Sequence, residues 1–361
     1  MIRILHCVSD GNVGGAGITL SRLVSSVDKS RFEIACAIPY GSKLTQRISC
    51  ASTDVFYYNA PADQSFSLKS VFEFVKIIRG FRPHIVHTHG CVSARLAAFL
   101  CGVRSRIYTA HTYAVRNPLF FLQFVNNLIT TKAIAVSPAL VSQVAASGVK
   151  LDKISVIYNG CEDMIKYSPK FCNENERSMT VLYHGRVTKE KGLDCAVKAI
   201  RILSDNNVDV RLTIVGDGEY KRELEAYSEA LDVRNNIKFL PYIEDIKECI
   251  NTSDVILNAS LFAEGTSNSV IEGMSAKRAV ILSDVEGNVC LSSNGKYGVL
   301  FNKGDAQDLS RAIMQIYENK SEYKKMSDAA RMGYEEHYTL KRMTDEYEKV
   351  WEREYEKRYK D

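Results

Sequence analysis

The sequence predicts an α/β protein built from two successive parallel-sheet domains. Short β-branched runs alternate with longer helical patterns, which is typical of a parallel sheet flanked by helices. The alternation breaks off in a polar segment before Ser178 and then begins again. A chain of 361 residues is long enough for two ordinary domains, and its 45% hydrophobic and 25% charged content is that of a globular protein with full cores.

The first alternation predicts a domain over residues 1–165. Helical patterns lie between its strands, for example at Leu68–Arg79 and Ala139–Ala146. Polar, irregular sequence then runs to about Ser178 and is interpreted as an inter-domain linker. The predicted strands are Ile2–Val8, Phe32–Ile38, Val55–Tyr58, Ile85–His87, Arg106–Ala110, Ala133–Val136 and Ile154–Ile157.

The second alternation predicts a domain over residues 178–339. After it, the segment 340–361 is a helix rich in Glu and Lys in which Tyr347, Trp351, Tyr355 and Tyr359 recur every fourth position. One aromatic stripe on a charged helix is expected to pack against another surface. The predicted strands are Thr180–His184, Arg211–Val215, Ile237–Leu240, Val255–Asn258, Val280–Ser283 and Gly298–Phe301, and the helices are Leu193–Leu203, Tyr220–Leu231 and Ala306–Tyr317.

The two halves of the chain carry opposite net charge. Residues 1–159 contain 17 Lys and Arg against 7 Asp and Glu, whereas the rest contains 30 against 36. No acidic residue occurs from Phe74 to Leu151, so the first domain presents a positive field. The apolar helix predicted at 117–133 fits either a core helix or a helix on an anionic membrane surface. Nucleic-acid binding has less support, because the cations lack the interleaved aromatic residues of a binding groove.

The sequence does not indicate secretion. The apolar run before Asp10 is too short for a signal peptide, and no stretch reaches membrane-spanning length. Ten cysteines are scattered without a CxxC pair, as expected for reduced thiols of a cytosolic protein. We therefore expect a cytoplasmic protein, with peripheral contact to the inner membrane face as a further hypothesis.

Two glutamates, Glu264 and Glu272, stand eight positions apart in "EGTSNSVIE". Because they follow the predicted strand Val255–Asn258, we expect Glu264 in a loop and Thr266 or Ser267 at the cap of the next helix. Amides at the start of that helix would form an anion site that suits phosphate. Glu272 would lie about a turn and a half inside the helix, where it either accepts hydrogen bonds from ligand hydroxyls or is an ordinary solvated residue.

Two cations follow the first strand of the second domain. Arg186 and Lys191 lie just beyond His184 and Gly185, and α/β proteins bind ligands at the carboxyl ends of parallel strands. Arg can clamp phosphate oxygens with two hydrogen bonds, and Lys adds a point charge. Because a phosphate-type helix start is predicted on the same sheet, a phosphate site is favoured over two unrelated surface cations.

The first domain offers a glycine-rich loop and several histidines. In "VSDGNVGGAGITL", Gly14 and Gly15 allow a ligand to approach the backbone, but the third glycine of a dinucleotide fingerprint is missing, so a tight turn is the better interpretation. His87, His89 and His111 lie at or just beyond strand ends. A zinc site formed by these histidines would lack nearby carboxylate or cysteine ligands. A hydrogen-bonding role toward a polar ligand fits His111, and a buried structural role fits His87.

Together these motifs resemble the retaining nucleotide-sugar glycosyltransferases of family 4, which have the GT-B fold of two Rossmann-like, doubly wound domains facing a cleft. The segments "VSPALVSQVAASGVKLDKISVIYNG", "IVGDGEYKRELE" and "YGVLFNKGDAQDL" are also similar to the family, and the last helix resembles its element that crosses back onto the first domain. The resemblance covers nearly the whole chain in the family's order. The matching motif positions are Gly14 and Gly15 in the first loop, Gly185, Arg186 and Lys191 in G-R-x4-K, and Glu264 and Glu272 in E-x7-E.

The resemblance implies a donor bound mainly by the second domain, an acceptor bound by the first, and catalysis in the cleft. It implies that Arg186 and Lys191 hold the diphosphate and Glu272 the ribose hydroxyls, while Glu264 and His111 lie near the transferred sugar. Thr266-Ser267 replaces the frequent Phe-Gly or Phe-Pro, which bears on the identity of the sugar. The other implied donor contacts are Gly14, Gly15, Gly185, Gly216, Tyr242, Gly265, Thr266, Ser267 and Asn268.

The reaction implied is sugar transfer from a nucleotide diphosphate, preferably UDP because it is common in the family, to a glycan or lipid-linked saccharide in bacterial cell-surface polysaccharide synthesis. Arg186, Lys191 and the helix start can neutralise the departing diphosphate in place of a metal ion, so neither a metal nor a cofactor is expected. Glu264 and Glu272 are too widely spaced for the paired carboxylates of retaining glycosidases. We therefore expect same-face substitution without a covalent sugar–enzyme intermediate.

Two other functions fit the same sequence. A nucleotide-sugar epimerase of the same fold would need no acceptor and would change the donor when incubated with it alone. A non-catalytic glycolipid- or phosphate-binding protein would show no turnover at all, so replacement of Arg186 would not change product formation.

Overall fold

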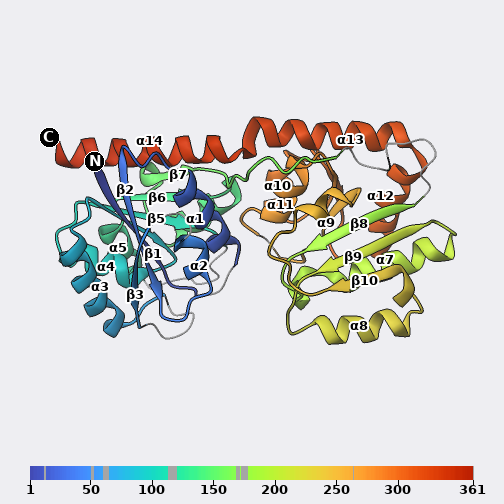
Figure 1. Cartoon of the computed structure of the whole chain (residues 1–361), viewed down its shortest axis with the longest axis horizontal. Helices are drawn as coiled ribbons and strands as arrows, with labels where there is room; N and C mark the ends of the chain where they lie inside the picture. The colour runs from blue at the N-terminus through green and yellow to red at the C-terminus, as the bar shows by residue number, and fades with distance from the viewer. Residues whose placement is uncertain are drawn as a thin grey trace. The chain divides into compact units, whose positions relative to one another are not determined.

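The computed structural model describes residues 1–11, 14–49, 53–59, 65–112, 120–167, 171, 178–262 and 264–360. The chain forms two compact units, one of Met1–Gly160 with Leu340–Asp361 (unit 1) and one of Cys161–Thr339 (unit 2). Figure 1 shows the order of the helices and strands along the chain. No helix among the described residues is both long and apolar enough to cross a membrane.

Unit 1 contains a seven-stranded parallel sheet with the order β3-β2-β1-β4-β5-β6-β7. Every residue of the central strand β4 is buried, as expected for a parallel strand covered by helices on both faces. The strands are β1 (Ile2–Val8), β2 (Phe32–Pro39), β3 (Asp54–Tyr58), β4 (Ile85–His89), β5 (Ser105–Ala110), β6 (Lys132–Ala135) and β7 (Ile154–Val156). The helices are α1 (Gly15–Ser26), α2 (Leu44–Ser49), α3 (Leu68–Phe81), α4 (Val92–Leu100), α5 (Phe120–Ile129), α6 (Val141–Ala146) and α14 (Leu340–Tyr359).

The aromatic stripe of α14 packs on one face of this sheet. Met343, Tyr347 and Trp351 are buried in a cluster with Ile4 of β1 and Ile85 of the neighbouring strand β4. This contact confirms the expectation that the stripe packs against another surface. The apolar side chains of the charged helix are buried there, while charged residues such as Lys349 and Arg353 are exposed.

Unit 2 contains a six-stranded parallel sheet with the order β10-β9-β8-β11-β12-β13. Its two central strands, β8 and β11, lie on either side of the switch in strand order. Every residue of β11 is buried, and so are four of the six residues of β8. The strands are β8 (Met179–His184), β9 (Val210–Val215), β10 (Ile237–Leu240), β11 (Val255–Asn258), β12 (Ala279–Ser283) and β13 (Val299–Phe301). The helices are α7 (Leu193–Asp205), α8 (Lys221–Ala230), α9 (Lys247–Asn251), α10 (Asn268–Ser275), α11 (Glu286–Leu291), α12 (Ala306–Glu318) and α13 (Lys320–Gly333).

The chain enters unit 2 at Cys161, earlier than the predicted linker suggested. The side-chain oxygen of buried Asn251 accepts hydrogen bonds from the amides of Lys166 (2.9 Å) and Tyr167 (3.2 Å). Phe171 is buried in the core of unit 2. The prediction of a linker is therefore wrong for these residues, because buried polar and aromatic contacts hold them to unit 2. Most of its remaining residues lie outside the described ranges.

Candidate active site

The candidate site of unit 2 lies at the carboxyl ends of β8, β9 and β11. The strand order reverses between β8 and β11, because successive strands run outward from β8 on one side and outward from β11 on the other. Ligands of open α/β sheets bind outside the strand ends at such a switch point. The motif residues that follow β8 and β11 are therefore placed where this fold binds ligands.

The loops after β8 and β9 approach each other closely through two glycines. Gly216 has a φ of +144°, and a Cβ atom there would lie 1.9 Å from the carbonyl oxygen of Gly185. Only glycine combines that backbone conformation with that approach. The close approach of the two loops thus requires glycine at position 216. The same approach fixes the position of the loop that carries Arg186.

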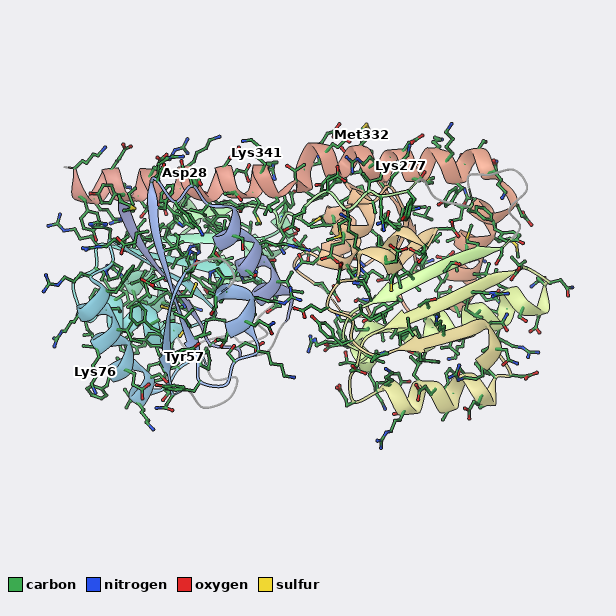
Figure 2. The ribbon with its side chains drawn as sticks, viewed as in Figure 1. Asp28, Tyr57, Lys76, Lys277, Met332 and Lys341 are labelled. Carbon is green, nitrogen blue, oxygen red and sulfur yellow. The ribbon has the colours of Figure 1, made fainter. Side chains whose placement is uncertain are left out.

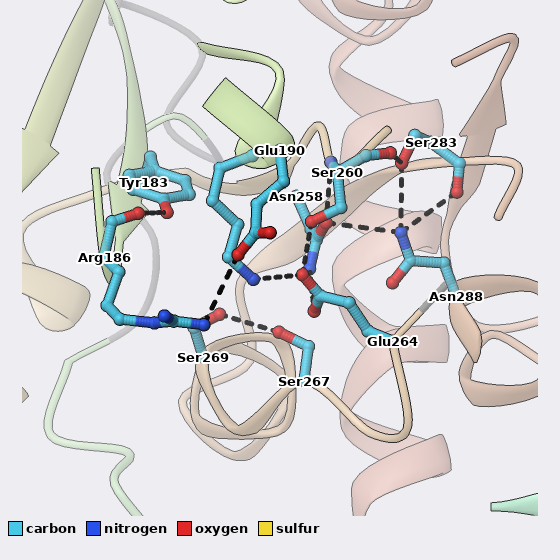
Figure 3. A network of polar contacts seen from close by, with 11 residues as sticks. Tyr183, Arg186, Glu190, Asn258, Ser260, Glu264, Ser267, Ser269, Ser283 and Asn288 are labelled. Atoms are coloured by element: carbon cyan, nitrogen blue, oxygen red, sulfur yellow. Dashed lines mark hydrogen bonds and ion pairs between the residues drawn. The ribbon is translucent and has the colours of Figure 1, made fainter. Parts of the chain in front are cut away.

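Lys191 and Glu264 form an ion pair that joins the loops after β8 and β11. The same carboxylate accepts a hydrogen bond from the hydroxyl of Ser260 at 2.5 Å and a long one from the amide of Asn258 at 3.4 Å (Figure 3). Burial by itself would raise the pKa of Glu264, but the charge of Lys191 and these hydrogen bonds hold it below its ordinary value. Glu264 is therefore ionised, and both of its oxygens accept hydrogen bonds.

Arg186 differs from Lys191 in being open to solvent. Its side chain is 71% exposed, and its guanidinium lies 3.4 Å from the carboxylate of Glu190. Its backbone carbonyl accepts a hydrogen bond from the buried hydroxyl of Tyr183 at 2.5 Å, which holds the residue at the strand end (Figure 3). The backbone of Arg186 is thus fixed, while its charged group can turn toward an anion.

Glu272 lies inside α10 and is 5% exposed. One of its carboxylate oxygens lies 3.5 Å from Nε2 of His184, the last residue of β8. The interpretation of Glu272 as an ordinary solvated residue is therefore wrong. Helix α10 turns this carboxylate inward, toward the strand end that precedes Arg186.

The start of α10 differs in detail from the expectation. Ser267 stands at the N-cap position, but its hydroxyl makes no capping hydrogen bond to the backbone. It lies 2.9 Å from the hydroxyl of Ser269 instead (Figure 3). Capping by the hydroxyl of Ser267 is thus wrong, while Gly265, Thr266 and Asn268 are placed around the helix start as predicted. First-turn amides of an α-helix have no partner within the helix, so this end can accept an anion.

Tyr242 follows β10, and its ring is half exposed. Its amide donates a hydrogen bond of 2.8 Å to the carboxylate of Asp217, just beyond β9. That hydrogen bond, together with one from Lys221, lowers the pKa of Asp217. A flat aromatic side chain is thereby held at the carboxyl end of the edge strand β10, next to the loop after β9.

Some residues that support the site were not identified from the sequence. A Cβ atom at Gly287 would lie 1.9 Å from the carbonyl oxygen of Glu264, so only glycine lets α11 approach the loop that carries Glu264. The amide of Asn288 contacts the side chain of Asn258 at 3.3 Å and the carbonyl oxygen of Ser283 at 3.0 Å. The signal available in the sequence was that two predicted strands end in polar residues, Asn258 and Ser283.

In unit 1, Gly14 precedes α1 and Gly15 begins it. The backbone of Gly14 is extended, and no atom lies within 4 Å of a Cβ placed there. Its conformation therefore does not require glycine. Asn12 and Val13, from the same loop, lie outside the described residues.

His111 follows β5, and its Nε2 lies 2.9 Å from Nδ1 of His89. Burial lowers the pKa of His111 to about 4. His87 is fully buried, as predicted for a structural histidine, and its Nδ1 accepts a hydrogen bond of 3.2 Å from the indole of Trp351.

Three buried histidines, His6, His87 and His89, lie close enough together to be considered as metal ligands. Trp351 can only donate, so it occupies the lone pair of His87 Nδ1, and His87 Nε2 lies 2.7 Å from the hydroxyl of Thr109. Both nitrogens of His87 are thus engaged in hydrogen bonds. The donor set therefore fits a hydrogen-bonded cluster better than a zinc site.

Comparisons with known proteins identify the class. Residues 13–163 match the sequence model described as "Glycosyltransferase Family 4", and residues 166–332 match "Glycosyl transferases group 1". The chain belongs to these group 1 glycosyltransferases of family 4, and it is a glycosyltransferase. Its α/β architecture of two Rossmann-like parallel-sheet units matches GT-B glycosyltransferase structures, which confirms the predicted fold class.

Two relatives of known name are similar over about seven tenths of their length. An Escherichia coli UDP-Gal:alpha-D-GlcNAc-diphosphoundecaprenol alpha-1,3-galactosyltransferase is 27% identical over 277 residues, which cover 70% of this chain and 71% of the relative. The capsular polysaccharide biosynthesis glycosyltransferase CapM of Staphylococcus aureus is 24% identical over 273 residues, 69% of this chain and 71% of the relative.

Two solved structures illustrate the shared fold. The glycosyltransferase from Rickettsia africae has a TM-score of 0.83 at 20% identity and covers 98% of both chains. Anabaena Alr3699/HepE, solved in complex with UDP, has a TM-score of 0.82 at 19% identity and covers 97% of this chain and 99% of its own.

Proposed function

We propose that this glycosyltransferase moves a sugar from a UDP-sugar to a lipid-linked saccharide in cell-surface polysaccharide synthesis, with retention of configuration and without a metal ion. The observation that carries the proposal is the ion pair of Lys191 with ionised Glu264 beside the exposed guanidinium of Arg186. The name of the Escherichia coli relative specifies a UDP-galactose donor and a diphosphoundecaprenol-linked acceptor, which supports this choice of substrates.

The cations would stabilise the departing diphosphate. When the bond between the anomeric carbon and the diphosphate oxygen breaks, negative charge grows on the phosphate, and fixed positive groups placed there lower the barrier. Arg186 can turn to this charge because it is exposed, and Lys191 is already held in place by Glu264. The helix start at Ser267–Asn268 would add backbone amides. These groups would supply the positive charge that a divalent cation supplies in other transferases.

Glu264 is better suited to hold the sugar than to attack it. Its oxygens already accept hydrogen bonds from Lys191, Ser260 and Asn258, which reduce its nucleophilicity. We therefore favour front-face substitution, in which the acceptor oxygen bonds to the anomeric carbon on the side from which the diphosphate leaves. The acceptor proton would pass to the departing phosphate oxygen, so no sugar–enzyme bond forms.

The test combines donor choice, stereochemistry and metal dependence in one assay. UDP-, GDP- and ADP-sugars are compared by thermal shift, since a ligand of the folded state raises the melting temperature. The preferred donor is then incubated with a prenyl-diphosphate-linked saccharide, with and without EDTA, and the product is examined by NMR. An α-linked product from an α-linked donor, formed equally in EDTA, is expected. Inversion, loss of activity in EDTA or epimerisation of the donor alone would each contradict the corresponding part of the proposal.

We also propose that unit 1 contacts an anionic membrane surface through α5. On this helix Phe121 is 70% exposed, Phe124 61%, Leu122 51% and Leu128 47%. The interpretation of 117–133 as a core helix is therefore wrong for these four side chains, which are not buried. The acid-free stretch of unit 1 also carries exposed cations, among them Arg104, Lys150 and Lys76, which points outward from α3 (Figure 2). Apolar side chains and cations together favour anionic lipid, and such a contact would bring the enzyme to a lipid-linked acceptor.

Sedimentation with lipid vesicles tests this contact. Binding is expected to vesicles that contain phosphatidylglycerol and not to purely zwitterionic ones, and it should weaken in high salt. Equal sedimentation with both kinds of vesicle, or with neither, would contradict it.

A further inference from the structure

Four buried or half-buried histidines line one face of the unit 1 sheet, beneath α14. In the parallel register His6 of β1 is paired with His87 of β4, and His89 of β4 is paired with Thr109 of β5. Since side chains alternate along a strand, His6, His87, His89 and Thr109 share a face. His111 continues the row just beyond β5, at the carboxyl ends of the strands.

Three of these histidines form a continuous hydrogen-bonded chain. His6 Nδ1 lies 3.1 Å from His89 Nε2, and His89 Nδ1 lies 2.9 Å from His111 Nε2. Burial holds the pKa of His6 near 3, that of His111 near 4 and that of His89 well below its usual range, so all three rings are neutral at pH 7. A neutral imidazole has one N–H and one bare nitrogen. Each of the two contacts, His6–His89 and His89–His111, therefore contains one proton. Because His89 carries a single N–H, the two hydrogen bonds must be donated in the same direction, either from His6 toward His111 or from His111 toward His6.

The inner end of the chain selects the direction. Nε2 of His6 is buried and has no hydrogen-bond partner among the described residues. If its proton were on Nε2, a donor would be buried without an acceptor, and orphaned buried N–H groups are rare. The alternative places the proton on Nδ1, where it is donated to His89, and leaves only a bare lone pair buried.

Donation from His6 toward His89 also determines the tautomer of His111. His89 accepts at Nε2, so it is protonated at Nδ1 and donates to Nε2 of His111. His111 must then carry its own proton on Nδ1. No hydrogen bond engages that nitrogen among the described residues, and His111 is only half buried.

His87 stands beside the chain but is fixed independently. The indole N–H of Trp351 donates to His87 Nδ1, which places the proton of His87 on Nε2, toward Thr109. His87 is therefore the opposite tautomer, and it provides an internal reference for the other three rings.

We propose that His6 and His89 are positioning residues that hold His111 as the Nδ1–H tautomer, so that His111 donates a hydrogen bond to a hydroxyl of a saccharide substrate at the strand ends of unit 1. The donation to a saccharide rests on the proposed function, whereas the tautomer of His111 does not. Without the chain, His111 would exchange between a donor and an acceptor at that position.

The decisive measurement is two-bond 15N–1H NMR of the full-length protein labelled at its seven histidines. The shifts of the two ring nitrogens distinguish the tautomers, and single substitutions assign the signals. We expect protons on Nδ1 of His6, His89 and His111 and on Nε2 of His87. A proton on Nε2 of His111 would overturn the proposal.

Three variants connect the tautomer to catalysis. His6→Leu removes the donor at similar volume, His6→Asn retains a side-chain N–H near the position of Nδ1, and Ile4→Val changes the same buried face without touching the chain. His6→Leu should mix the tautomers of His111 and lower kcat about tenfold, with the donor KM nearly unchanged. His6→Asn should retain most of the Nδ1–H tautomer of His111 and most of kcat. Ile4→Val should change neither the tautomer nor kcat.

The two readouts separate the inference from the proposed function. If His6→Leu leaves the His111 signals unchanged, the positioning role is wrong, even in an active transferase. If the wild-type protein transfers no sugar, the proposed function is wrong. The NMR pattern then decides by itself whether the hydrogen-bonded histidines set the tautomer of His111. Equal kcat losses in His6→Leu and His6→Asn, with both folded by thermal melting, would show a packing effect and would also overturn the role.

Discussion

Lys191 donates a hydrogen bond to the carboxylate of Glu264 across 73 positions of sequence. Both side chains are about four-fifths buried, and the pair joins the loop after β8 to the loop after β11. Removal of either side chain is costly, because it leaves the other charge buried without its counterion. The pair is therefore both a structural tie and the core of the proposed donor site.

The pair is expected to be energetically coupled. Glu264→Gln and Lys191→Met should each lower the free energy of unfolding by about 1–3 kcal/mol, and the double variant should lose less than the sum. Urea denaturation of the four proteins measures the coupling. Additive losses would show that the contact does not contribute. Glu264→Gln should also lower kcat about 100-fold.

Replacement of Arg186 should affect activity and spare stability. The side chain is largely exposed, and its ion pair within the described part of the chain is a long one, to Glu190 at 3.4 Å, so Arg186→Ala should leave the melting temperature unchanged. Loss of a cation at the diphosphate should reduce kcat about 100-fold or more. Arg222→Ala, an exposed position on α8 of the same unit, is the matched control and should retain full activity. Equal activity of the two variants would remove Arg186 from the site.

Gly216→Ala should strongly destabilise unit 2. The new Cβ would lie 1.9 Å from the carbonyl oxygen of Gly185, at a φ that side chains rarely adopt. A loss of several kcal/mol is expected, since strain and overpacking each cost about 1–3 kcal/mol. Gly80→Ala in α3 is the control, because no atom lies within 4 Å of its Cβ and alanine favours the helix. Similar chemical denaturation curves for the two variants would contradict the close approach.

The buried histidines should make stability depend on pH below neutrality. Their pKa values are lowered in the folded state, to about 3 for His6 and about 4 for His111, so the folded chain stays neutral while the unfolded chain takes up protons near pH 6.5. The stabilisation is complete above pH 6.5 and is lost as the pH falls, by about 1.4 kcal/mol per pH unit for each histidine. Urea midpoints at pH 7, 6 and 5 measure the slope. His6→Leu should flatten it by the share of one histidine, and an unchanged slope would count against the burial of His6 as a neutral ring.

Two phenylalanines of α5 should control vesicle binding. Phe121→Ser combined with Phe124→Ser should reduce sedimentation with anionic vesicles at least tenfold, since each side chain is more than 60% exposed and free to enter the interface. The melting temperature should not fall, because both rings are mostly exposed to solvent. Phe72→Ser on α3, which is 70% exposed, is the control for a lone exposed ring. Unchanged binding of the double variant would exclude α5 as the contact.

The sequence alone determined the elements of this protein and the residues at their ends. Alternating β-branched and helical segments predicted the thirteen strands found among the described residues to within about two residues, because burial on both faces of a parallel sheet leaves a local pattern in the chain. The same locality placed Arg186 and Lys191 after β8, and Glu264 after β11, because a residue that follows a strand lies at its carboxyl end in any parallel sheet.

Only the tertiary structure decided what these side chains contact. The ion pair of Lys191 with Glu264, the burial of Glu272 against His184 and the row from His6 to His111 each join strands that are distant in sequence. Such contacts depend on strand order and on which face each residue occupies, and no local pattern specifies them. The passage into unit 2 at Cys161 was decided in the same way, because a buried Asn251 from a later helix, and not the polarity of the segment, holds Lys166 and Tyr167 in place.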